Sequence, residues 1–199
     1  MDFTALKERL ERNQFTVSVF ATGQEAAGYL DQAIDGRTVG CGGSMTLQEL
    51  GLYDRLVAHN TLYYHGAAQD SQAAMAAAAS AQIYICSVNA IAADEGALLN
   101  IDGTGNRVSA SLFGHEKVYF VVGRNKVAPD FHQALWRARN IAAPKNAQRL
   151  RRRTPCAAKG DRCYDCDSPE RICNGLVVYW KRLRGVEMEV VLIDQELGY

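Results

Sequence analysis

Four cysteines near the carboxyl end of the chain are the residues best suited to bind a metal. Cys156, Cys163, Cys166 and Cys173 follow the spacing C-x6-C-x2-C-x6-C. The two-residue gap lets two thiolates converge on one ion, and the outer cysteines complete a tetrahedron. Four thiolates suit zinc and iron–sulfur clusters alike. The spacing therefore predicts a metal-binding loop at 154–175 that holds Zn2+ or a 4Fe-4S cluster, in preference to four unrelated surface thiols.

A glycine-rich stretch, VGCGGSMTLQELG, is typical of a ligand-binding turn between a strand and a helix that begins near Thr46. Glycines let the backbone approach a ligand closely, and the free N–H groups at a helix start attract an anion. The alternative, a plain glycine turn, stays open. We expect a small anionic or carboxylate ligand to bind at this turn, through Gly42, Gly43, Ser44, Met45 and Thr46.

Two adjacent carboxylates, Asp94 and Glu95, precede a glycine and predict a catalytic turn. Neighbouring carboxylates push their pKa values apart, so one of them is suited to act as a base or nucleophile. An arginine nearby favours a substrate carboxylate or phosphate. The alternative is that this segment forms an ordinary turn whose carboxylates are exposed to solvent. The polar residues that follow the turn, and that we expect to help bind the ligand, are Asn100, Asp102, Asn106 and Arg107.

Alternating strand-like and helix-like segments predict the scaffold that positions these residues. Such a rhythm is typical of an α/β fold with a parallel sheet and crossover helices. Strands are predicted at 16–20, 38–40, 61–64, 82–87, 97–101, 118–122 and 188–193. Helices are predicted at 3–12, 24–34, 46–57, 69–80 and 129–142, the last ended by Pro144. We expect Thr22 and Thr46 to cap helix starts, and we expect one domain over 1–199.

Composition narrows the class of protein. The chain has 199 residues, 48% of them hydrophobic, with 22 basic and 22 acidic side chains. Its longest apolar run, 73–79, is too short to cross a bilayer, and its first residues mix apolar and charged types, unlike a secretory leader. We therefore expect a cytoplasmic protein with reduced cysteines.

Half of the basic residues, 11 of 22, lie between positions 145 and 184. A run of like charges is usually a solvated face. Single-strand binding also needs stacking aromatics, and Tyr164 is the one aromatic residue in the cysteine-rich loop. We therefore do not expect a nucleic-acid partner.

The order of motifs is similar to that of the LUD domain (lactate utilisation) family. The glycine-serine loop, ADEGALLNIDGTGNRVSA, FGHEKVYFVVGRNKV and RARNIAAPKNAQRL follow one another over nearly the whole chain, and the cysteine stretch with RICN and ELGY resembles a stand-alone branch. The resemblance implies a Rossmann-like fold, as in ribose-5-phosphate isomerase, glucosamine-phosphate deaminase and the coenzyme A transferases. It also implies a role in oxidation of lactate to pyruvate, beside iron–sulfur oxidoreductase subunits.

Two functions remain open. The first is a redox-associated or small-carboxylate-binding protein with a metal in the cysteine loop, and, if it is an enzyme, an oxidoreductase component of lactate metabolism. The alternative is an isomerase or coenzyme A transferase-like enzyme with a structural zinc. Such an enzyme would act on a phosphorylated or acyl substrate through Asp94 or Glu95.

Overall fold

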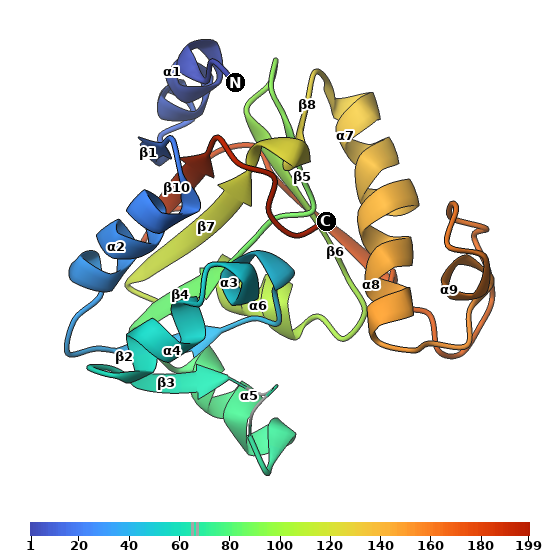
Figure 1. Ribbon diagram of the computed structural model, residues 1–199, viewed down its shortest axis with the longest axis horizontal. Helices are drawn as coiled ribbons and strands as arrows, with labels where there is room; N and C mark the ends of the chain where they lie inside the picture. Colours follow the sequence, from blue (N-terminus) through green and yellow to red (C-terminus); the bar gives the residue numbers. More distant parts are fainter. Residues whose placement is uncertain (65, 67) are drawn as a thin grey trace.

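The computed structural model, which describes residues 1–64, 66 and 68–199, is built on a six-stranded parallel sheet (Figure 1). All five strand pairs of this sheet are parallel. The central strands are apolar along nearly their whole length, as expected where both faces of a sheet are covered. In spatial order the strands are β1 (Thr16–Phe20), β10 (Glu187–Ile193), β7 (Lys117–Gly123), β4 (Ile83–Cys86), β2 (Thr38–Cys41) and β3 (Thr61–Tyr64).

A second sheet of four short strands lies beside the first. Its inner positions are largely alanine, and Ala90, Ala92, Ala97 and Ala134 belong to one small buried cluster. The sequence predicted only one of these four strands, and alanine, which favours strands weakly, explains why the segment Ala90–Ala92 was missed. In spatial order they are β8 (Val127–Ala128), β5 (Ala90–Ala92), β6 (Ala97–Asp102) and β9 (Gly175–Tyr179).

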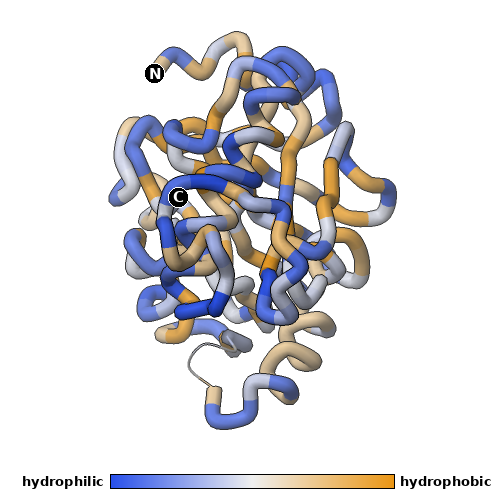
Figure 2. The backbone as a smooth tube through the Cα atoms, turned by 90° about the vertical axis from the view of Figure 1, so that its right-hand side faces the viewer, coloured by the Kyte–Doolittle hydropathy of each residue, from blue (hydrophilic) through white to orange (hydrophobic). Residues whose placement is uncertain are grey.

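Helices cover both faces of the six-stranded sheet, so the predicted α/β fold with a parallel sheet is confirmed. Hydrophobic segments run through the interior, and hydrophilic ones lie along the surface (Figure 2). One core cluster includes α1 (Thr4–Arg12) and α6 (Asn106–Leu112). The other includes α2 (Gly23–Ala33), α3 (Met45–Glu49) and α4 (Leu52–Val57). The remaining helices are α5 (Ser71–Ala79), α7 (Phe131–Arg137), α8 (Ala143–Arg149) and α9 (Pro155–Lys159).

Local chemistry fixes the helix starts. Thr22 caps α2 in a reciprocal arrangement with Glu25, as predicted. The single helix predicted over 46–57 is wrong: Gly51 adopts φ 62° and separates α3 from α4. Ser44, and not Thr46, is the N-cap of α3, because its hydroxyl accepts a hydrogen bond from the Leu47 N–H.

Pro144 does not end its helix, which corrects a second prediction. A π-helical turn, Ala138–Ala142, joins α7 directly to α8. The Ala143 N–H bonds to the carbonyl of Ala138, five residues earlier. Proline then falls at the start of α8, where its missing N–H costs little. The helix therefore continues to Arg149 and reaches the edge of the parallel sheet.

The cysteine-rich stretch is an excursion between α8 and β9. It begins with α9, which lies beside α8 and away from the six-stranded sheet (Figure 1). Within the part of the chain that the structure describes, no helix is long and apolar enough to cross a bilayer.

Candidate functional site

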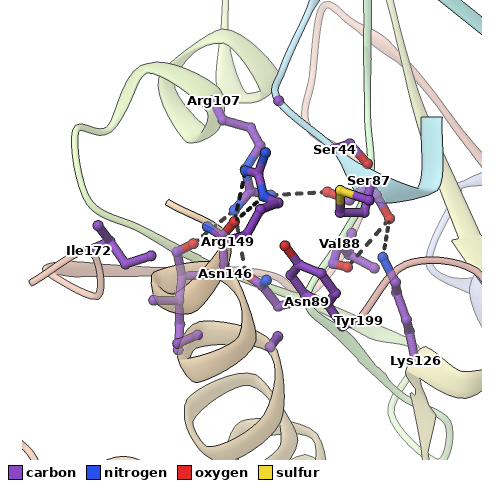
Figure 3. A pocket seen from close by; sticks show the side chains of 15 residues that line it. Ser44, Ser87, Val88, Asn89, Arg107, Lys126, Asn146, Arg149, Ile172 and Tyr199 are labelled. Atoms are coloured by element: carbon purple, nitrogen blue, oxygen red, sulfur yellow. Dashed lines mark hydrogen bonds between the residues drawn. The ribbon is translucent and has the colours of Figure 1, made fainter. Parts of the chain in front are cut away.

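A cavity of about 70 Å³ lies at the carboxyl edge of the parallel sheet (Figure 3). Its walls come from the turns that follow β2 and β4, from a 3-10 turn after β7 (Arg124–Lys126), and from α8. Since the strands are parallel, their carboxyl ends meet at one edge, where ligands bind in open α/β sheets. A buried water needs roughly 10–15 Å³ by this measure, so the cavity suits a ligand of about five non-hydrogen atoms.

Positive charge dominates the cavity lining. Arg107, Lys126 and Arg149 all line it. Among the described residues that line it, none is acidic. The cations raise the local concentration of anions, and the low-dielectric walls strengthen that effect. The charge of the cavity lining therefore favours a negatively charged ligand over a positively charged one.

Arg107 is held in place by protein acceptors. It follows Gly105, which adopts φ 88° at the start of α6. Its guanidinium donates to the Ser87 carbonyl at 3.0 Å, to the Ile101 carbonyl at 2.8 Å and to Oδ1 of Asn100. Since these bonds use donors that a ligand would otherwise need, Arg107 contributes mainly a fixed positive charge.

Three further predicted residues support Arg107. Oδ2 of Asp102 lies 3.6 Å from its Nε. Asn100 is fully buried behind the cavity wall. A side chain at Gly42 would place its Cβ 3.1 Å from Cγ of Arg107, so the glycine makes room for the arginine. These residues position the site without lining it.

Lys126 is one of the cavity residues that sequence reasoning did not predict, together with Ser87, Arg149 and Tyr199. Its side chain is 3% exposed, and its Nζ donates to Oγ1 of Thr46 at 2.7 Å and to Oγ of Ser87 at 2.9 Å. Burial, reinforced by the charges of Arg137 and Arg107, lowers the pKa of Lys126 to about 7. Lysine is rarely buried, so it drew no attention in the sequence. Its position just after the 118–122 strand was the available signal.

Tyr199 and Arg149 form the mouth of the cavity. Arg149 is exposed and donates from Nε and Nη2 to Oδ1 of Asn146, at 3.1 and 2.8 Å. The Tyr199 ring points into the cavity (Figure 3). Its hydroxyl oxygen is buried, which raises its pKa, and it makes no well-formed hydrogen bond, although Arg149 lies close enough to lower that pKa in part. A buried hydroxyl without a well-formed hydrogen bond is costly. A ligand that accepts this hydrogen bond removes that cost.

The predicted ligand-binding residues divide into two groups. The structure brings Thr46 to the buried end of the cavity, where its hydroxyl accepts from Lys126, and leaves Asn106 at the start of α6, outside the lining. The predicted residues that line the cavity are Gly43, Ser44, Met45 and Arg107.

The predicted catalytic acids lie elsewhere. Asp94 and Glu95 occupy the turn between β5 and β6 and do not line the cavity. The Glu95 carbonyl accepts from Nδ2 of Asn13 at 2.7 Å. Partial burial and the neighbouring carboxylate of Asp94 raise the pKa of Glu95. A catalytic role for this pair stays a prediction.

The four thiols of the cysteine-rich stretch are free and half-buried. Arg139 Nη2 lies 3.7 Å from Sγ of Cys163, and Arg171 Nη2 lies 3.5 Å from Sγ of Cys173. In the described part of the chain, no group of three or more His, Cys, Asp or Glu side chains is placed to hold a metal ion. The donor chemistry suits a metal and this arrangement of donors does not, so we derive no chemical step through a metal.

Comparison with known proteins gives two findings. A family model described as "LUD domain" matches residues 4–193. The fold is similar to that of a DUF162 family protein from Deinococcus radiodurans, with a TM-score of 0.53 and 9% sequence identity, over 95% of this chain and 94% of that one. At that identity the likeness concerns the fold alone. No curated protein matches the sequence.

Proposed function

The chain belongs to the LUD domain family, which is linked to lactate utilisation, and from this premise we propose that its cavity binds a small carboxylate of the lactate and pyruvate class. The observation that carries the proposal is the buried Tyr199 hydroxyl, which lies at the cavity close to Arg149 and makes no well-formed hydrogen bond. A carboxylate oxygen accepts such a hydrogen bond.

The charge and size of the cavity support the same class of ligand. The cationic side chains of Arg107 and Arg149 favour a negative charge, and the volume of about 70 Å³ admits about five non-hydrogen atoms. Lactate and pyruvate are of this size. Nucleotides and sugar phosphates are larger and would have to project through the mouth past Arg149.

Calorimetric titration with lactate, pyruvate and inorganic phosphate at low salt tests the proposal. We expect saturable binding of the carboxylates by the wild-type protein. Arg149→Gln and Tyr199→Phe each remove a donor to the anion, and a hydrogen bond to a charged group contributes about 1.5–3 kcal/mol, so affinity falls about tenfold to a hundredfold. Arg152→Gln, an exposed arginine outside the cavity lining, is the matched control.

Two results would contradict the proposal. One is the absence of saturable carboxylate binding to the wild-type protein. The other is an equal loss of affinity in the Arg149 and Arg152 variants, which would indicate a general charge effect. Tight binding of phosphate with no binding of carboxylates would favour the alternative enzyme class, which acts on phosphorylated substrates.

We also propose that Cys156, Cys163, Cys166 and Cys173 of the segment 154–175 come together to bind Zn2+ or a 4Fe-4S cluster, which requires a rearrangement of that segment because its described residues do not form a ready-made metal site. The support is their spacing in the sequence. Protein purified without oxygen should contain either zinc or iron, and iron would come with the broad visible absorption of a cluster and would favour work beside iron–sulfur oxidoreductase subunits. A colourless protein free of both metals would refute this proposal and leave the carboxylate proposal intact.

A further inference from the structure

We propose that Lys126 is a nucleophile whose amine forms an imine with the carbonyl carbon of a small 2-oxo carboxylate bound in the cavity. The inference rests on the proposed function, because the same cavity must first bind the carboxylate. It adds a covalent step that binding alone does not require.

The hydrogen bonds around Nζ leave one direction of the amine unused. Oγ1 of Thr46 donates to the Leu197 carbonyl at 3.2 Å, and Oγ of Ser87 donates to the Val88 carbonyl at 3.5 Å. Both hydroxyls therefore accept from Nζ of Lys126, at 2.7 and 2.9 Å. A neutral amine has two hydrogens, and both are committed to these oxygens. The lone pair remains for a ligand, and Lys126 lines the cavity.

The surroundings of the amine favour its neutral form. The side chain is almost completely buried, and Arg137 and Arg107 add positive charge, which disfavours a third cation. Glu49 and Cys86 oppose this effect with a smaller influence than burial. A lysine desolvated next to other cations is the usual setting of an amine nucleophile.

The step balances without a further reactant. The Nζ lone pair forms a bond to the carbonyl carbon, and the carbonyl π pair moves to oxygen. The two amine hydrogens leave with that oxygen as water, and the carbon–nitrogen double bond remains. Thr46 and Ser87 each already hold one of these hydrogens in a hydrogen bond, so they are suited to guide its transfer. The positive lining offsets the charge of the substrate carboxylate.

Ser87 is the competing nucleophile in the same cavity. It lies beside Lys126 and is 5% exposed. Activation of Ser87 would require its hydroxyl to donate to Nζ, whereas Nζ donates to Oγ of Ser87 at 2.9 Å and the other contact of that hydroxyl is the Val88 carbonyl at 3.5 Å. The geometry therefore favours the amine over the hydroxyl as the attacking group.

Borohydride trapping tests the inference on the full-length protein. Treatment with pyruvate and borohydride should increase the mass of the wild-type chain by that of pyruvic acid minus one oxygen atom. Peptide mapping should place this adduct on Lys126. Lys126→Met has no amine and should lose the adduct, and Lys181→Met, a change at an exposed lysine, should keep it. Lactate has no ketone carbonyl and forms no imine, so an excess of lactate should suppress labelling by occupying the cavity.

Labelling of the wild-type protein at different pH values gives a second readout that does not depend on a variant. Adduct formation at Lys126 should rise with pH, and the midpoint of this rise should lie near pH 7, because the pKa of the amine is about 7. Surface lysines should respond near their ordinary pKa of about 10.4.

The outcomes separate this inference from the proposed function. Calorimetric binding of pyruvate without an adduct on Lys126, or an adduct found only on other lysines, would overturn the imine and leave the binding proposal standing. Absence of both binding and adduct would overturn both. Acylation of Ser87 by small activated esters, with no trapped imine, would assign the nucleophile to Ser87 instead.

Discussion

Replacing Lys126 with methionine should make the protein more stable at neutral pH. Burial lowers the pKa of this amine from its ordinary 10.5 to about 7. Each pKa unit corresponds to about 1.4 kcal/mol, so holding the lysine in the folded protein at pH 7 costs about 5 kcal/mol. Methionine has a similar length and no charge, and it removes that cost.

Two hydrogen bonds are lost in the same substitution. Thr46 and Ser87 each accept one bond from Nζ, and a typical bond contributes about 1 kcal/mol. The expected net gain in the free energy of unfolding for Lys126→Met is therefore about 3 kcal/mol at pH 7. The pKa of Lys126 is lower in the folded protein than in the unfolded chain. At pH values between these two pKa values the unfolded chain therefore binds more protons, so the stability of the wild type rises as pH rises from 7 to 10.

Urea denaturation of the wild type and of Lys126→Met at pH 7 and pH 9 measures both effects. The advantage of the variant should shrink by about 3 kcal/mol over those two pH units, since each unit is worth about 1.4 kcal/mol. Lys181→Met, at an exposed position, should show neither the gain nor the pH dependence. A Lys126→Met protein that is less stable than wild type at pH 7, or whose difference from wild type is independent of pH, would refute the reasoning.

Three other substitutions test the scaffold by the same assay. Glu189 is buried 2.8 Å from Nζ of Lys117, so Glu189→Gln should lower the free energy of unfolding by about 3 kcal/mol, whereas Glu187→Gln, at an exposed position, should change it little. Gly40→Ala would press a Cβ against the α5 backbone, 3.0 Å from its nearest Cα, and should destabilise by about 1–3 kcal/mol; a neutral effect would contradict the packing. Burial lowers the pKa of His115, so wild-type stability should fall as pH drops below the unfolded value of about 6.5, and His115→Asn should remove that part; identical pH profiles would disprove it.

The sequence was a good guide to the parallel sheet because its strands are short segments rich in β-branched, aromatic and other apolar residues. The strands at 16–20 and 61–64 have the predicted bounds. Prediction failed where tertiary context decides the outcome. The alanine-rich strand Ala90–Ala92 forms because it pairs with Ala97–Asp102 and lies in a buried cluster, and neither condition is visible in its local pattern.

The candidate site was predictable only in part for a related reason. Glycines and hydroxyls after a strand mark a turn that approaches a ligand, and the structure places Gly43 and Ser44 on the cavity. Tyr199 and Lys126 reach the same cavity from distant positions in the chain. The order of the strands in the sheet brings such residues together at one site, and this order cannot be deduced from a single sequence.

The position of β10 between β1 and β7 has a consequence for how the chain folds. Residue Thr16 pairs with Glu189, so the first strand formed at synthesis finds its partner only when the last strand is available. Contacts of such long separation in sequence slow folding and leave a strand edge open to other chains in the meantime. During translation, β1 therefore stays without its parallel partner until the chain has been extended through Ile193.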